Sequence, residues 1–180
     1  MLVFRTMWKD WGFAATLRSQ ARHFQHLAQR TAVGGEQEGC IRASIVFSVM
    51  SFEALFFREI IRGYIDRHRA EIAPKNLEKV EDGLNGKKGR FTGIWKAVTT
   101  WPELLTGANL AVGFQCVDFL KLVDYRNALV HGDIARQLAQ SGTLAQEVET
   151  VANAELALHV IGEFEKHVAQ HFGFSLPAWE

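Results

Sequence analysis

The sequence predicts an all-α protein in which four long helices form an antiparallel bundle. Only three prolines occur in 180 residues, alternating β-branched stretches are absent, and apolar residues recur three and four positions apart over several long segments. Hydrophobic residues make up 48% and charged residues 22%, as in ordinary folded proteins. The length fits one domain, residues 1–180, with an inserted segment at about 72–113.

The first half of the chain contains two of the expected long helices. We expect the first over about Trp8 to Ala32, because Gly34 and Gly35 follow it and glycine commonly ends a helix. The second should span about Glu36 to Ala70 and belong to the core. Its apolar stripe advances by threes and fours for more than five turns and consists of Ile41, Ile45, Val49, Phe52, Phe56 and Ile60.

The segment at about 72–113 has shorter and less regular patterns. It reads as a short helix near Asn76 to Leu84, a polar turn, and a helix from Phe91 to Trp101 that ends before Pro102. We expect this insertion to lie over one end or edge of the bundle.

Two further long helices complete the predicted bundle. One should span Phe114 to His131, closed by Gly132. The last should begin after Thr143, because Gln146 three residues later makes a capping box, and should stop near Gly173. Short connections between long helices favour antiparallel neighbours.

Charge and hydropathy restrict the classes of function. Twenty basic and twenty acidic residues give a net charge of zero, which argues against a protein that coats nucleic acid through bulk charge. Arg5, Lys9 and Asp10 interrupt the apolar N-terminal stretch before a secretion signal forms. The apolar stretch from Ile45 to Phe57 contains Glu53 and reads as too short and too polar for a bilayer. We therefore expect a cytoplasmic protein without a membrane partner.

One group of polar residues stands out at the end of the helix predicted over Phe114 to His131. Arg126 and Asn127 are followed by His131, and Gly132 comes next. On an ideal helix Arg126 and His131 point about 140° apart, whereas Asn127 and His131 share a face. Convergence of all three therefore needs the long arginine side chain, a loosened last turn or a second subunit.

The chemistry of these side chains suits cleavage of a phosphodiester. A histidine in a last helical turn titrates near neutral pH, and an arginine presents a planar cation to phosphate oxygens. Together they can transfer a proton and stabilise charge without a metal. Arg18 and His23 have the same spacing, but lie in mid-helix without the following amide and glycine.

The segment Arg126-Asn127-Ala128-Leu129-Val130-His131 resembles the signature of the HEPN superfamily (higher eukaryotes and prokaryotes nucleotide-binding domain). Members are helical bundles with an acidic residue in an upstream core helix, here Glu53. The resemblance covers roughly Gly39 to Phe172. It implies a metal-independent endoribonuclease without a cofactor, a toxin or defence effector in many members, whose two motifs meet in a homodimer.

The resemblance also implies roles for the residues of the motif. His131 would exchange protons with the ribose 2′-OH or the leaving oxygen, Arg126 would stabilise the transition state, and Asn127 would orient the histidine or a phosphate. RNA would be the substrate and an antitoxin protein a further partner. One toxin subgroup has tyrosine two positions after the histidine, where this chain has Asp133, so assignment to that subgroup is weakened.

Plainer interpretations remain open for each of these residues. The domain could be a catalytically inactive scaffold or a nucleotide-binding or protein-binding module. Arg126 could pair with Asp124 or Asp133 at a helix end, and Glu53 could form a structural salt bridge with Arg126, Arg58 or Arg62.

Two other patterns have a functional and a structural interpretation. Glu163, His167 and His171 repeat every four residues and could ligate a metal, but a solvated helix face is commoner, and we expect no metal site. Trp95 and Trp101 could stack on nucleic-acid bases or anchor the insertion to the core.

Overall fold

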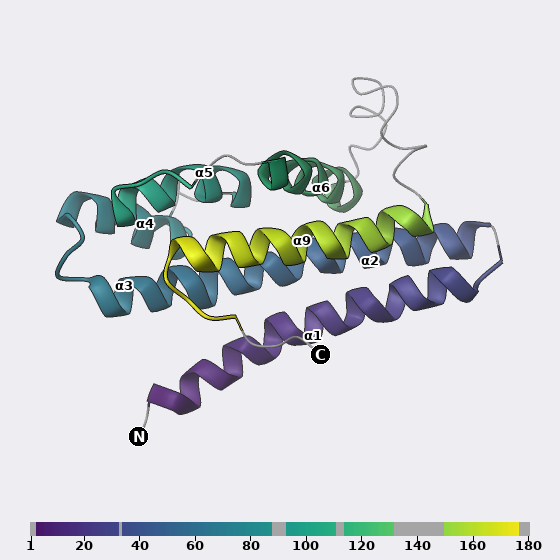
Figure 1. The fold of residues 1–180 in the computed structure, drawn as a ribbon, viewed down its shortest axis with the longest axis horizontal. Helices are drawn as coiled ribbons and strands as arrows, with labels where there is room; N and C mark the ends of the chain where they lie inside the picture. Colours follow the sequence, from purple (N-terminus) through teal and green to yellow (C-terminus); the bar gives the residue numbers. More distant parts are fainter. Residues whose placement is uncertain (1–2, 33, 88–92, 111–113, 132–149, 177–180) are drawn as a thin grey trace.

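A computed structural model describes residues 3–32, 34–87, 93–110, 114–131 and 150–176 (Figure 1). Every regular element in these ranges is helical and none is a strand, which confirms the predicted all-α class. The α-helices are α1 (Val3–Arg30), α2 (Gly35–Ala54), α3 (Arg62–His68), α4 (Pro74–Leu84), α5 (Ile94–Thr106), α6 (Phe114–His131) and α9 (Val151–His171), with a π-helical segment, Leu55–Ile61, between α2 and α3.

The helices lie in three layers (Figure 1). Helices α2 and α9 lie side by side in the middle, α1 packs on one side of them, and α4, α5 and α6 lie on the other. Helices α1 and α2 run in opposite directions, whereas α9 runs in the same direction as α2. Helix α6 crosses the middle layer at a steep angle and contacts both α2 and α9.

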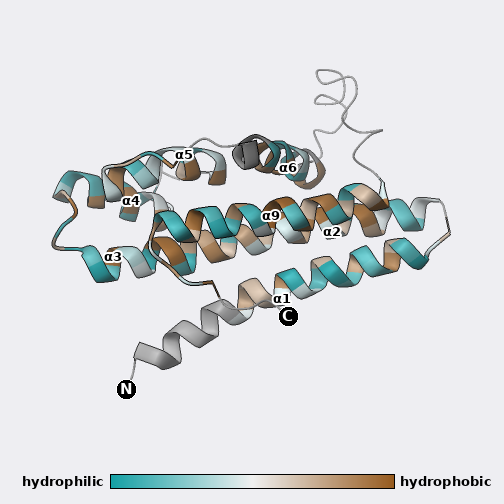
Figure 2. Ribbon diagram, in the orientation of Figure 1, coloured by the Kyte–Doolittle hydropathy of each residue, from teal (hydrophilic) through white to brown (hydrophobic). Residues whose placement is uncertain are grey.

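Aromatic side chains fill the centre of the core. The rings of Phe52, Phe119 and Phe164, from α2, α6 and α9, have centroids 4.3 to 5.1 Å apart, and all three are fully buried. Each such ring contributes about 1.5–3 kcal/mol of stability through burial. The apolar sides of α2 and α9 accordingly face the interior (Figure 2). This cluster fixes where α6 lies relative to α2.

Helix α2, the π segment and α3 form one continuous rod, Gly35–His68, as the apolar stripe predicts. The π segment was not expected, since the stripe passes through it without a break. The rod is longer than the Ile45 to Phe57 stretch that reads as too short for a bilayer. Among the described residues it is the one helix long and apolar enough to cross one, by length and composition alone. Half of its most apolar window is buried inside the protein, and core helices of soluble proteins pass the same test.

Helix α5 continues beyond the predicted end. Pro102 lies inside the helix, which ends at Thr106, before Gly107 with φ of 75°. The expectation of an end before Pro102 is wrong because the buried stripe of α5 spans it, with Trp101 and Leu105 on either side in the core. Packing of this face outweighs the backbone hydrogen bond that proline cannot make. The segment at 72–113 therefore contributes to the core.

The bounds of α6 and the end of α9 agree with the prediction, whereas the start of α9 does not. Helix α6 has the predicted bounds, and α9 ends at His171 as expected. However, α9 begins at Val151, because Thr150 has extended backbone and its hydroxyl accepts a hydrogen bond from the Asn153 amide, at 3.2 Å. The start expected after Thr143 is therefore wrong. Thr143 and Gln146 themselves lie outside the described residues.

Candidate functional site

The structure brings together two of the predicted site residues, Arg126 and Glu53. Arg126 lies on α6 and Glu53 on α2, and the Arg126 guanidinium donates through Nη2 to the Glu53 carboxylate in an ion pair. The side chains are 14% and 24% exposed, so solvent reaches both partners. Of the three arginines considered for Glu53, the chain uses the one on the neighbouring helix. The predicted acid and the motif arginine therefore form one polar centre.

Local sequence explains why both residues lie at the border of the core. On α6, Arg126 follows Phe119 and Val123 at helical spacing, and these two are buried. On α2, Glu53 follows Phe52, whose ring is part of the aromatic core. Once the core rings pack, the two charged side chains lie at the contact between α2 and α6. A buried charge without a partner is costly, so each stabilises the other.

The environment of Arg126 is unusual for an arginine near the surface. Burial lowers its pKa from the ordinary value, although a guanidinium remains charged at neutral pH. Its Nε is buried and has no hydrogen-bond partner among the described residues. Glu53 therefore does not use every donor of the guanidinium.

Asn127 and His131 lie on the same helix as Arg126. Asn127 is half-buried, and His131 is the last residue of α6, but the side chain of His131 lies outside the described part of the structure. Five residues separate Arg126 from His131, which corresponds to a rise of about 7.5 Å along the helix. The backbone therefore places all three motif residues in the last turns of α6, without showing how the histidine meets the arginine.

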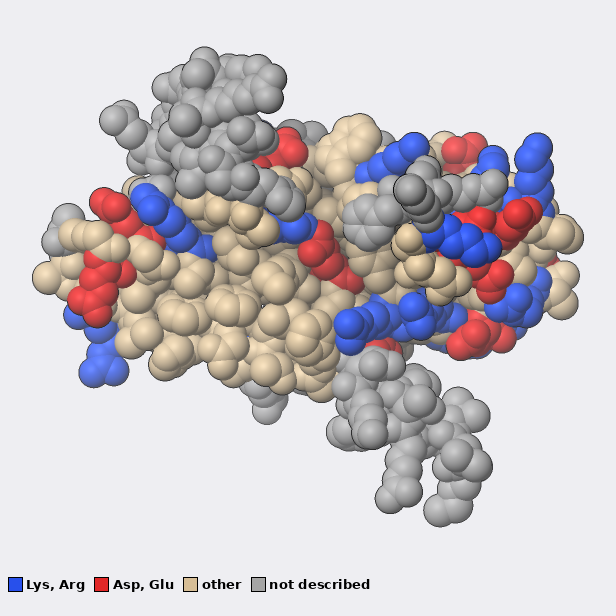
Figure 3. Space-filling model, turned by 180° about the vertical axis from the view of Figure 1, so that it is seen from behind, with Lys and Arg blue, Asp and Glu red and all other residues tan. Residues whose placement is uncertain are grey.

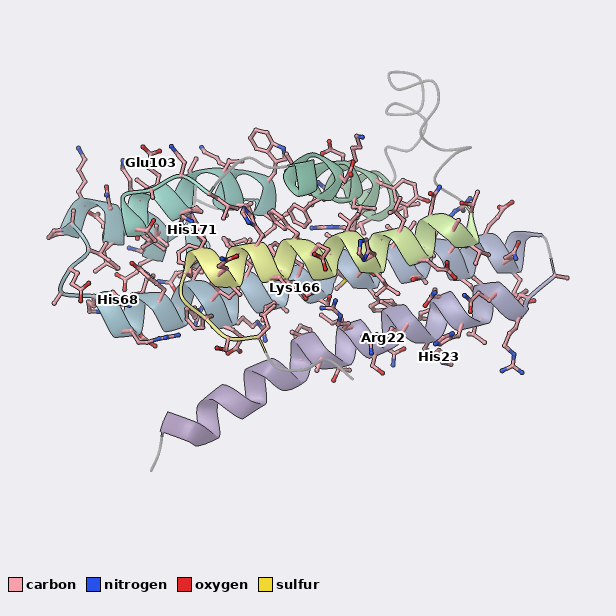
Figure 4. All side chains as sticks on the ribbon, in the orientation of Figure 1. Arg22, His23, His68, Glu103, Lys166 and His171 are labelled. Carbon is pink, nitrogen blue, oxygen red and sulfur yellow. The ribbon has the colours of Figure 1, made fainter. Side chains whose placement is uncertain are left out.

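Glu163 and His171 of α9 contact other side chains of the protein. Within the described residues, no three His, Cys, Asp or Glu side chains are grouped closely enough to hold an ion. Glu163 accepts a hydrogen bond from Lys166 at 2.7 Å, which lowers the pKa of Glu163. The His171 Nε2 lies 3.1 Å from the Thr106 hydroxyl, and burial, with a further contribution from His167, lowers the pKa of His171. His171, Glu103 and His68 lie at one end of the molecule (Figure 4).

Sequence reasoning missed a second ion pair, which is more deeply buried. Arg18 of α1 donates to Glu165 of α9, with 9% and 2% of their side chains exposed. Burial raises the pKa of Glu165, and the positive charge of Arg18 opposes this shift. A signal was present in the sequence, since Arg18 continues the buried stripe of Ala14 and Leu17. A charge on an apolar face indicates a buried partner.

Comparisons with known proteins leave the identity open. No protein-family model matches the chain, and no curated protein or solved structure matches it. The functional interpretation therefore rests on the residues and their geometry.

Proposed function

We propose that this protein is a metal-independent endoribonuclease of HEPN type, with Arg126, Asn127 and His131 as catalytic residues and Glu53 as a supporting residue. The ion pair between Arg126 and Glu53 carries this proposal. It links the arginine of the motif with the acid of the upstream core helix, the two features on which the resemblance depends. Residues 1–180 then form one HEPN-like helical domain whose long helices are α1, α2 with α3, α6 and α9, although α9 runs parallel to α2 and not antiparallel to it as expected.

Each residue has a role that its chemistry supports. Glu53 holds the guanidinium of Arg126 in place through one of its donors, and the other donors stabilise the negative charge that builds on the phosphate. His131 removes the proton of the ribose 2′-OH or protonates the leaving 5′-oxygen, and Asn127 orients the histidine or a phosphate oxygen. The products are a 2′,3′-cyclic phosphate and a 5′-OH, so DNA resists cleavage and chelators do not inhibit.

A homodimer would complete the site, and one face of α2 supports this part of the proposal. Residues 43–57 contain a single charged side chain, Glu53, and a row of half-buried apolar residues with helical spacing. From behind, where α2 faces the viewer, the molecule has a broad area without Lys, Arg, Asp or Glu (Figure 3). The row consists of Ala43, Val46, Phe47, Met50 and Phe57.

Pairing of two copies through this face brings two Glu53–Arg126 pairs close together, since Glu53 belongs to the same face. The resemblance implies that the two motifs, each with Arg126 and His131, then share one site. Substitution of Val46 by Asp should convert the dimer to a monomer and abolish cleavage, while Leu156→Asp, at an exposed position of α9, should do neither. Sedimentation and cleavage assays measure both effects. A wild-type monomer that cleaves RNA would contradict the shared site.

The cleavage assay uses purified protein and structured RNA in the presence of EDTA. We expect Arg126→Ala and His131→Ala each to reduce the rate about 10²- to 10⁴-fold. His23→Ala is the matched control, because His23 follows Arg18 at the same spacing but lies exposed on α1 (Figure 4). Cleavage that survives both motif substitutions, or that is absent from the wild type with several RNAs, would refute the nuclease.

In cells, such an enzyme is expected to act in the cytoplasm as a toxin or defence effector held in check by an antitoxin protein. The alternative is an inactive scaffold that binds a nucleotide or protein with the same residues. In that case Arg126→Ala abolishes ligand binding, and no RNA is cleaved by the wild type.

A further inference from the structure

The two tryptophans of α5 have opposite environments. Trp101 is 3% exposed, and its ring lies 5.4 Å from that of Phe57, so it anchors α5 to the core. Trp95, six residues earlier, is 51% exposed. The buried face of α5 consists of residues such as Ile94, Val98 and Leu105, and Trp95 lies outside it. Anchoring therefore explains Trp101 but not Trp95.

No described residue uses the indole ring of Trp95. It makes neither a ring contact nor a side-chain hydrogen bond within the described part of the chain. Tryptophan carries the largest side-chain surface available for binding, and a half-exposed indole contributes little to the stability of the fold. A flat aromatic face open to solvent is suited to stacking on another flat ring.

The sequence next to Trp95 points to the chemistry of its partner. Residues 83–102 contain four basic residues and no acidic one, and the two that the structure describes are Lys87, which pairs with Asp82, and Lys96. Lys96 follows Trp95 directly and is exposed. Aromatic rings beside basic side chains bind single-stranded nucleic acid, because every base has a face for stacking and every phosphate carries a charge.

We infer that Trp95 stacks on an unpaired base of single-stranded RNA, while Lys96 contacts a neighbouring phosphate. This inference rests on the proposed function and adds to it a binding position outside the Glu53–Arg126 pair. Phe57 lies one turn beyond Glu53 and touches Trp101, which lies less than two turns from Trp95. A strand of several nucleotides is therefore long enough to contact both positions.

The test measures binding separately from cleavage. A labelled oligonucleotide of 2′-O-methyl uridine lacks the attacking hydroxyl and is bound without being cut, so fluorescence anisotropy with the intact protein reports affinity alone. We expect Trp95→Ala to weaken binding about 5- to 150-fold, the effect of losing one stacked base. Trp95→Phe should retain most of the affinity because it keeps a ring, whereas Trp95→Leu should behave like Trp95→Ala.

Two further variants check specificity. Leu156→Ala is the matched control, since Leu156 is 54% exposed on α9 and carries no ring, and it should bind like the wild type. Lys96→Gln should reduce the slope of log affinity against log salt by about 0.7, the value for one phosphate contact on a single strand. A wild type that does not bind the oligonucleotide, or Trp95→Ala with unchanged affinity, would overturn the inference.

The outcomes also separate this inference from the proposed nuclease. If ordinary RNA is cleaved through Arg126 and His131 but Trp95→Ala binds the methylated strand like the wild type, stacking is wrong and the nuclease stands. If Trp95→Ala weakens binding and no RNA is cleaved, the nuclease is wrong and stacking stands.

Discussion

Removal of one member of the Arg18–Glu165 pair should destabilise the protein strongly. Both side chains are almost entirely buried, and loss of one partner leaves the other as an uncompensated charge. Such losses cost about 3–5 kcal/mol. For a chain of this length, 1 kcal/mol shifts the unfolding temperature by about 2–4 °C, so Arg18→Met or Glu165→Leu should lower it by roughly 6–20 °C.

The two variants should differ in their pH dependence. In Arg18→Met, the pKa of the isolated Glu165 rises further above its unfolded value, because the positive charge of Arg18 no longer counteracts the effect of burial. The folded state then retains a proton that the unfolded state loses, so the stability of this variant falls as the pH rises from about 4 towards 7. In Glu165→Leu the remaining charge is an arginine, which does not titrate in this range, so no such added loss is expected.

Urea unfolding followed by circular dichroism at pH 4 and pH 7 measures both effects. The double variant Arg18→Met with Glu165→Leu should be more stable than either single variant, because neither charge remains buried. Glu163→Gln on the same helix is the control and should unfold with the wild-type midpoint, since its pair with Lys166 is exposed. A single variant of the buried pair with wild-type stability would show that the pair does not hold α1 on α9.

Three further predictions concern helix ends and a histidine. Gly107→Ala should cost about 1–2 kcal/mol, because φ is 75° there, whereas Gly39→Ala, at an exposed position within α2 where an added Cβ meets nothing within 4 Å, should be neutral or stabilising; equal effects in urea unfolding would contradict the left-handed end of α5. Thr150→Ala should cost about 1 kcal/mol and speed amide exchange in the first turn of α9, and Thr150→Ser should restore the wild-type values; unchanged exchange would refute the cap. His171 has a pKa below its unfolded value, so stability should fall as the pH drops below about 6.5, and His171→Gln should reduce this dependence; a wild-type slope in that variant would assign the effect elsewhere.

The bounds of a helix were predicted correctly where its apolar spacing and its terminating residues indicated the same ends. Helix α6 has regular apolar spacing and a glycine directly after it, and its bounds were predicted correctly. The start of α9 was not, because Thr143 with Gln146 forms a capping box in the sequence, whereas Thr150, the observed cap, is followed at that spacing by Asn153. At Pro102 the local preference of proline was overruled by tertiary packing of the buried face of α5.

The candidate site shows the same division between local and tertiary information. The sequence identified Glu53 and Arg126 separately, from an acid at the border of a stripe and from a short motif. It could not choose among three arginines as the partner of Glu53, because that choice depends on how α6 crosses α2. Arg58 instead lies 4.8 Å from the centre of the Phe13 ring on α1. The residue pattern of a single helix does not show how that helix crosses its neighbours, and so does not show which arginine reaches Glu53.

The π-helical segment, Leu55–Ile61, makes the rod of α2 and α3 tolerant to a change in its length. In an α-helix, one added or removed residue turns everything beyond it by about 100°. A π segment takes up an extra residue while the flanking faces keep their directions. Loss of one residue within Leu55–Ile61 should therefore leave Glu53 facing α6 and Tyr64 facing Phe172, whereas the same deletion near Ile45 should turn Glu53 away from Arg126. The rod thus contains a position where evolution can add or remove a residue without rebuilding either end.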